Sequence, residues 1–185
     1  MACTEAWLKL QPIIKIVFMS TVSAFCSTIL GFATPVWIST KIDIHLFSPN
    51  GYVGKGTVNY LGIWQACGGV GDIVGCINTS FKDLPAFYVA TRVFACFGLI
   101  STFITTALVF WYSCISKGET GRALIGSMFS SFISGGLLAI TVAIFGAEVG
   151  KYITLSFSFA MMCIASILYV VNGVLFLVYL CSGRR

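Results

Sequence analysis

Cys67 and Cys76 are the residues whose type and spacing most clearly permit chemistry, because they stand nine positions apart in one polar segment. Four glycines lie in or beside the turn between them: Gly68, Gly69, Gly71 and Gly75. Glycine tolerates the backbone angles of a tight turn, so the two thiols can meet across a hairpin and form a disulfide. Closing a loop of this size stabilises a fold by about 2–3 kcal/mol. Disulfides persist in oxidising compartments, so we expect this segment outside the cell.

Other patterns with catalytic or metal-binding potential are sparse. His45 is the sole histidine, so any Ser-His-Asp or Cys-His arrangement would depend on it, and we expect it to be a solvated strand residue. Cys67 and Cys76 lack the further ligands that a closed metal site requires. The glycine-rich turn lacks the Lys-Ser/Thr pair of a phosphate-binding loop. We therefore expect no enzyme activity and no cofactor.

The composition indicates a membrane protein. Of the 185 residues, 58% are hydrophobic and only 9% are charged, and the mean hydropathy is +0.97. An ordinary soluble domain carries about 25% charged residues, so this chain is expected to have the lipid bilayer as its surroundings. The net charge of +5 is spread along the chain, and its longest basic run is Arg184-Arg185. We therefore expect no nucleic-acid partner.

A transmembrane helix needs about 20 consecutive apolar residues. Four runs qualify, over residues 13–34, 86–112, 123–147 and 153–180. A cleaved signal peptide is the alternative for the first run, but its length favours a retained span. The sequence thus predicts a single membrane domain over residues 1–185, an all-α four-helix bundle with an extracellular loop over residues 35–85.

Four spans place both termini on the same side of the membrane. That side carries six basic residues against two acidic ones, and the opposite side five against four. Because cytoplasmic flanks accumulate Lys and Arg, we expect a multi-pass protein of the plasma membrane with both termini in the cytoplasm.

The 35–85 loop is expected to form a small extracellular antiparallel β-sheet. Residues 36–47 alternate in part between apolar and polar side chains, which is the period of a half-buried strand. Residues 52–64 mix glycine with β-forming residues, and glycine predicts short strands or bulges there. We expect three or four strands at the outer mouth of the bundle.

Two kinds of covalent modification are indicated. Asn78-Thr79-Ser80 matches the acceptor pattern for N-glycosylation, with a chance match as the alternative. Cys3, Cys114 and Cys181 fall near the predicted cytoplasmic interface, where thiols can be palmitoylated. Plain reduced cysteines are the alternative at these three positions.

Small residues repeat at every fourth position of the third span, and the predicted helix-packing face consists of Ser127, Ser131, Gly135, Ala139 and Ala143. Helices in lipid associate through close contact of such residues. Packing within the bundle is the favoured interpretation, and a homodimer face is the alternative.

Arg92 is the one cation well inside an apolar run. Charge inside a membrane is costly, so such a residue is usually paired or faces a cavity. We expect Arg92 to reach loop carbonyls, Asp83 or Glu148 and to tie the sheet to the bundle. Lining an ion path is the alternative.

Several residues of the large loop resemble the first outer loop of the claudin, peripheral myelin protein and epithelial membrane protein superfamily, whose signature is a Trp, then Gly-Leu-Trp, then two cysteines. The matching residues are Pro35, Trp37, Gly62, Ile63, Trp64, Cys67 and Cys76. Ile63 stands where the family has leucine. Arg92, in Ala90-Thr91-Arg92, looks like the arginine at the family's entry to the second span. The resemblance covers the four-span layout of the whole chain.

This resemblance implies a claudin-like fold, a left-handed four-helix bundle capped by a small sheet whose disulfide joins two strands. It also implies a role in cell–cell contact, junctional sealing or a paracellular barrier, with the chain itself or other claudin-like proteins as partners in cis or trans. Two departures favour a different role, as an auxiliary or trafficking subunit of a membrane channel or receptor. The third and fourth spans are closely spaced, and the chain ends in Gly183-Arg184-Arg185 instead of an apolar motif read by scaffold domains.

Overall fold

The computed structural model describes residues 11–48, 51–70, 73–79, 84–115, 121–149 and 155–182. Within these residues, four helices are long and apolar enough to cross a membrane: α2 (Pro12–Ala33), α3 (Ala86–Phe110), α4 (Gly121–Val149) and α5 (Phe157–Ser182). A π-helical turn, η2 (Trp111–Ile115), prolongs α3. Each helix overlaps one of the four runs in which the sequence predicts a span. The chain is a multi-pass membrane protein.

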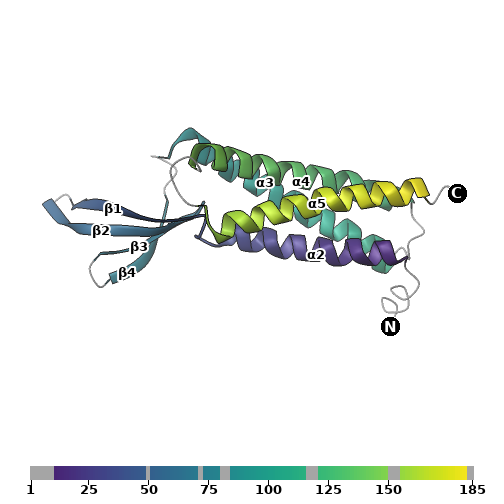
Figure 1. Cartoon of the computed structure of the whole chain (residues 1–185), viewed down its shortest axis with the longest axis horizontal. Helices are drawn as coiled ribbons and strands as arrows, with labels where there is room; N and C mark the ends of the chain where they lie inside the picture. The colour runs from purple at the N-terminus through teal and green to yellow at the C-terminus, as the bar shows by residue number, and fades with distance from the viewer. Residues whose placement is uncertain are drawn as a thin grey trace.

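The four helices form a ring in which α2 contacts α3 and α5, while α4 contacts the same two neighbours from the other side. Figure 1 shows that α2 begins and α5 ends at the same end of the bundle, and that the sheet extends from the opposite end. The helices therefore run alternately up and down, which is the arrangement that short connections between long apolar helices produce.

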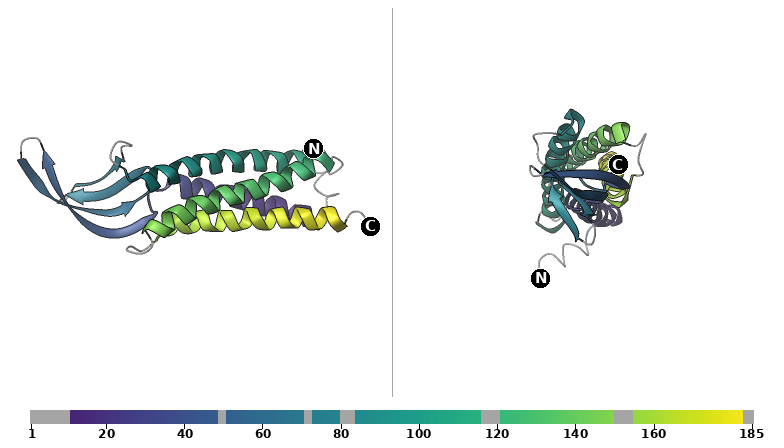
Figure 2. Two further views of the ribbon diagram at one scale, coloured as in Figure 1. Left: turned by 90° about the horizontal axis from the view of Figure 1, so that it is seen from above. Right: turned by 90° about the vertical axis from the view of Figure 1, so that its left-hand side faces the viewer.

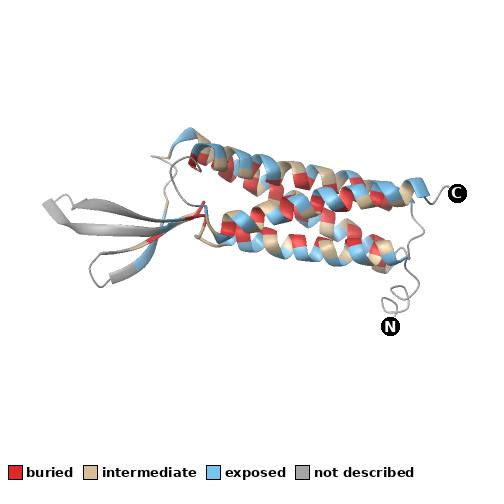
Figure 3. Cartoon of the chain, in the orientation of Figure 1, coloured by how far each residue is buried: buried red, intermediate tan, exposed pale blue. Residues whose placement is uncertain are grey.

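The burial pattern is that of a protein surrounded by lipid. Large apolar side chains point outward on the helices, and Ile16, Phe103 and Ile167 are 61%, 64% and 62% exposed. Buried residues follow the inner faces of all four helices (Figure 3). Soluble monomers rarely expose apolar patches of this extent, whereas a bilayer covers them without cost.

The interior of the bundle is rich in small hydroxyl side chains. Thr21 Oγ1 donates to the carbonyl of Val17 at 2.7 Å, a bond within its own helix. Other hydroxyl bonds join different helices, such as Ser101 with Ser134 at 2.8 Å between α3 and α4. Asn172 Nδ2 on α5 donates to Thr21 Oγ1 on α2 at 3.1 Å. Hydrogen bonds of this kind hold helices together where lipid offers no hydrophobic driving force.

The predicted packing face of α4 is only partly buried. Ser127, Ser131 and Gly135 are buried, whereas Ala139 and Ala143 are exposed. A four-residue step turns a helix by about 40° beyond a full turn, so a stripe at this spacing winds around the helix. Of the predicted face, Ser127, Ser131 and Gly135 pack inside the bundle, whereas Ala139 and Ala143 do not, and the alternative of a homodimer face stays a prediction for those two residues.

Gly135 is expected to tolerate no larger residue, because α5 packs directly on it. A Cβ at this position would lie 2.7 Å from Val170 Cγ2 and 3.2 Å from the carbonyl oxygen of Ser166. Gly135→Ala should destabilise the bundle by about 1–3 kcal/mol through overpacking, measured as a lower melting temperature in detergent. Gly136→Ala is the control, since a Cβ there meets no heavy atom within 4 Å. Equal melting temperatures for the two variants would contradict close α4–α5 packing at Gly135.

The sheet has four antiparallel strands in the described part of the chain: β1 (Ile38–Ser48), β2 (Gly51–Leu61), β3 (Gln65–Val70) and β4 (Ile73–Asn78). Each strand pairs with the next along the chain, and the strands project lengthwise beyond the helix ends (Figures 1 and 2). This confirms the predicted antiparallel sheet. Residues 52–61, for which glycine predicts short strands or bulges, belong to one continuous strand, β2. The pairing of β2 with β3 shifts in register between Val58 and Tyr60, as at a β-bulge.

Candidate functional site

The predicted disulfide between Cys67 and Cys76 is confirmed. The two residues lie directly opposite each other on β3 and β4, with Cα atoms 4.1 Å apart and an S–S distance of 2.05 Å. Gly68 and Gly75 form the next pair of the same ladder. The bond therefore joins the last two strands near the base of the sheet, next to the bundle.

Trp37 anchors the exit from α2 to the rest of the bundle. Its indole is fully buried, and Nε1 donates to the carbonyl oxygen of Gly31 at 2.7 Å. The ring packs edge-on against Phe145 of α4 and Phe159 of α5, with centroids 4.9 and 6.0 Å apart. One side chain thus joins three helices at the point where the chain turns into β1.

The segment before α5 is also fixed in the region where the sheet meets the helix bundle, which we call the junction. Backbone N–H groups of Ser156 and Ser158 donate to the carbonyls of Trp37 and Val36 at 2.9 and 3.0 Å. An antiparallel bridge pairs Ile38 with Leu155. The start of β1 is therefore fixed by backbone bonds to the beginning of the last helix.

Gly62, Ile63 and Trp64 form the turn between β2 and β3. The N–H of Gly62 donates to the carbonyl of Gln65 at 2.8 Å, and the Ile63 side chain is completely buried. The ring of Trp64 packs against Phe32 with centroids 5.1 Å apart. Because α2, the turn and the sheet meet here, these residues position the sheet on the end of the bundle.

Arg92 bonds the sheet to α3. Arg92 is 2% exposed, and its Nε donates to the carbonyl of Ile63 at 2.6 Å. Nη2 donates to the carbonyl of Thr79 at 3.2 Å and also to the Thr79 hydroxyl. The guanidinium carbon lies 5.2 Å from the Trp64 ring centroid and 5.3 Å from that of Tyr88, within the range of cation–π attraction. These contacts are the tie between sheet and bundle that the sequence predicts for Arg92.

The predicted carboxylate partners of Arg92 have different outcomes. Glu148 is exposed at the end of α4 and forms no ion pair with Arg92 in the structure. Asp83 lies outside the described residues. The carbonyl groups to which Arg92 donates belong to the loop. Loop carbonyls were also among the partners that the sequence predicted for this residue.

Two residues of the junction were not singled out by sequence reasoning. Tyr88 lies one helical turn before Arg92 on the same face, and its hydroxyl donates to the carbonyl of Gly62. Thr79 Oγ1 donates to the carbonyl of Trp64 at 2.9 Å in addition to accepting from Arg92. The four-residue spacing of Tyr88 and Arg92 could have indicated that Tyr88 belongs to the junction. For Thr79, the sequence indicated only a place in the glycosylation pattern Asn78-Thr79-Ser80.

The predicted modification sites lie at different places in the fold, with Asn78 beside the junction and Cys181 at the other end of the bundle. Asn78 is exposed at the end of β4, and its Oδ1 accepts a bond from Gln65 Nε2 at 3.3 Å. Cys181 is an exposed free cysteine at the end of α5. Cys114 is disulfide-bonded, which removes the free thiol that palmitoylation requires there. Cys3 lies outside the described residues, as does the side chain of His45.

The junction is built for holding two parts of the chain together. The side chains of Arg92, Tyr88, Thr79 and Trp37 bond to backbone carbonyls or to one another, and the aromatic rings pack on one another, whereas Trp64 Nε1 is buried without a hydrogen-bond partner among the described residues. Among the residues that the structure describes, no three His, Cys, Asp or Glu side chains come together as metal ligands. No protein-family model matches this chain, and no curated protein matches it.

Gly62→Ala is expected to disturb the junction more than a comparable change elsewhere in the sheet. A Cβ at Gly62 would overlap Cα of Pro35 and lie 3.0 Å from its carbonyl carbon. Both are backbone atoms, so the turn must shift, and we expect a loss of about 1–3 kcal/mol in stability, measured by thermal unfolding. Gly75→Ala is the control on β4, since a Cβ there meets nothing within 4 Å. A larger loss from Gly75→Ala would contradict this assignment.

Proposed function

We propose that this chain is a claudin-like integral membrane protein that acts at cell–cell contacts, where it seals or supports a paracellular barrier. The observation that carries the proposal is the junction itself. A disulfide-joined sheet is fixed to one end of a four-helix membrane bundle through Trp37, the Gly62-Ile63-Trp64 turn and Arg92. These are the residues on which the resemblance to the claudin superfamily rests.

The placement of the sheet supports this role. The strands project beyond the helix ends along the axis of the bundle (Figure 2), so their far ends stand away from the membrane surface. With both termini in the cytoplasm, as the charge distribution favours, the sheet lies outside the cell. There it can meet copies of the chain, or other claudin-like proteins, on the same or a neighbouring plasma membrane.

A sealing or adhesive role is favoured over an ion-selective channel. In the 35–85 loop, three basic residues stand against three acidic ones: Lys41, Lys55, Lys82, Asp43, Asp72 and Asp83. A surface whose charges nearly cancel creates little field to select cations from anions.

Expression in non-adherent cells tests the proposal. The protein is tagged and produced alone, and its density is compared at contacts between two expressing cells and at contacts between an expressing and a non-expressing cell. We expect enrichment at the first kind of contact only, with strands visible in freeze-fracture replicas. A uniform distribution over the plasma membrane would contradict a contact function.

A second candidate function is that of an auxiliary or trafficking subunit of a channel or receptor. Only residues 150–156 separate α4 from α5, which limits a second outer loop. In addition, a groove of about 560 Å³ runs between α3 and α4 on the lipid-facing side, lined by Phe97, Ile104 and Phe129 among others. A uniform surface distribution together with a channel or receptor that co-purifies in stoichiometric amount would favour this function.

A further inference from the structure

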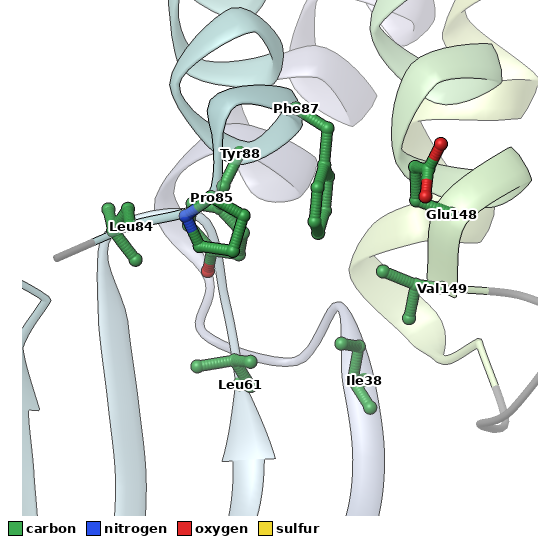
Figure 4. Close-up of a pocket in the computed structure, with 8 residues that line it drawn as sticks. All are labelled: Ile38, Leu61, Leu84, Pro85, Phe87, Tyr88, Glu148 and Val149. Carbon is green, nitrogen blue, oxygen red and sulfur yellow. The ribbon is translucent and has the colours of Figure 1, made fainter.

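A pocket of about 280 Å³ lies where the sheet meets the start of α3 and the end of α4 (Figure 4). Ile38, Leu61 and Val149 form much of its apolar lining. Phe87 and Glu148 stand on different walls, Phe87 on the first turn of α3 and Glu148 on the last turn of α4. Glu148 carries the one carboxylate among the described lining residues.

The lengths of the helices place this pocket at the level of lipid head groups. The span Ala86–Cys114 and α4 contain 29 residues each, which corresponds to about 43 Å of helix at 1.5 Å per residue. The hydrocarbon core of a bilayer is about 30 Å thick and reaches about 40–45 Å with the head groups included. The first turn of α3 and the last turn of α4 therefore extend beyond the hydrocarbon, and the pocket between them faces the head groups of the leaflet on the sheet's side.

The charge distribution around the pocket complements a zwitterion. Glu148 lies at the C-terminal end of α4, where the helix dipole adds to its negative charge, and it is exposed with no ion pair among the described residues. The Phe87 ring, which also lines the pocket, can attract a cation through a cation–π interaction. Close by, α3 begins after Pro85 without a side chain that caps its first turn. The N–H groups of Tyr88 and Val89 donate to the carbonyl of Pro85, so the N–H groups of Ala86 and Phe87 form the positive end of the helix, which attracts an anion such as a phosphate.

The apolar lining distinguishes between cationic head groups. A primary ammonium group brings three N–H donors that each need an acceptor. Apart from the Glu148 carboxylate, the side chains around this pocket offer few acceptors, because they are aliphatic or aromatic. A trimethylammonium group carries no N–H donor, and its methyl groups pack favourably on aromatic and aliphatic carbon.

We propose that this pocket binds the head group of a choline phospholipid from the surrounding leaflet. The trimethylammonium group lies between Phe87 and Glu148, and the phosphate faces the N-terminal amides of α3. This lipid site goes beyond the proposed contact function and does not depend on it, because it requires only the membrane and the junction between sheet and bundle.

Native mass spectrometry of the full chain tests the site. The protein is released from nanodiscs that contain equal amounts of phosphatidylcholine, phosphatidylethanolamine and phosphatidylglycerol, and the retained lipids are counted. We expect phosphatidylcholine to be preferred over either competitor by about three- to fivefold, the effect of one carboxylate and one aromatic contact at a partly exposed site. Glu148→Gln and Phe87→Leu should each remove most of this preference, whereas Phe103→Leu, at an exposed position of α3 away from the pocket, should keep it.

The outcomes separate the proposal from its alternatives. Equal retention of phosphatidylethanolamine and phosphatidylcholine by the unaltered protein would overturn it, because an ammonium group would then serve as well. Retention that Glu148→Gln leaves unchanged would overturn it too, since the pocket would then hold only an acyl chain or a sterol. Each variant is first checked for an unchanged melting temperature. If Phe87→Leu fails this check, Glu148→Gln decides alone, because its side chain is exposed and its replacement keeps the shape.

Discussion

Cys67→Ser is expected to prevent most of the protein from reaching the cell surface. The strands that Cys67 and Cys76 join are only six residues long, and they hold the end of the sheet next to Arg92. Loss of the bond removes about 2–3 kcal/mol, a large fraction of what so small a sheet can gain from its own packing. Surface biotinylation of transfected cells measures the loss, and protease sensitivity of the extracted protein reports whether the sheet has opened.

The double variant Cys67→Ser/Cys76→Ser separates the lost bond from the effect of an unpaired thiol. It should fail to the same degree as the single variant, because the missing crosslink is the shared defect. Cys181→Ser is the matched control, since Cys181 is exposed and free at the other end of the bundle. Normal surface delivery of the single Cys67→Ser variant would show that the disulfide contributes little to folding.

Arg92→Met is expected to loosen the sheet from the bundle while leaving the helices folded. The carbonyl groups of Ile63 and Thr79 would each lose a charged donor inside a buried site. An unsatisfied buried acceptor costs about 1–3 kcal/mol, so the combined loss should lower the melting temperature markedly. Circular dichroism in detergent should show retained helix content, and hydrogen exchange should rise in β3 and β4.

Conservative and distant replacements provide the controls for Arg92. Arg92→Lys keeps the charge but has no planar guanidinium to reach both carbonyl groups, so it should restore only part of the stability. Arg122→Met removes an exposed cation near the start of α4 and should leave the melting temperature unchanged. If Arg92→Met unfolded like the unaltered protein, Arg92 would not be the tie between sheet and bundle.

The sequence was sufficient for those parts of the fold that depend on local chemistry. Runs of apolar residues predict membrane helices because the bilayer requires a minimum length. The Cys67–Cys76 bond was likewise predictable, since a glycine-rich turn brings two nearby thiols together across a hairpin. The antiparallel sheet was predictable from the alternation of apolar and polar side chains along the loop. A disulfide across a hairpin is also what so small a sheet needs for stability.

Features that depend on distant partners were beyond sequence reasoning. The ring of Trp37 lies against Phe145 and Phe159, which are more than a hundred positions away in the chain. The exposure of Ala139 depends on where α5 crosses α4, and a spacing of four residues carries no information on that point. Arg92 had several carbonyl groups within plausible reach, and only the folded junction shows that it bonds those of Ile63 and Thr79.

The hydroxyl groups inside the bundle have a consequence for how the chain is made. Thr21, Thr28 and Thr141 each donate to a carbonyl four residues earlier in the same helix, so each helix can leave the translocon with these donors already satisfied. The Asn172 amide is different, because its donor is met by Thr21, 151 positions earlier. Helix α5 therefore carries a polar requirement that α2 meets, and this hydrogen bond stabilises the contact between those two helices once both are in the membrane.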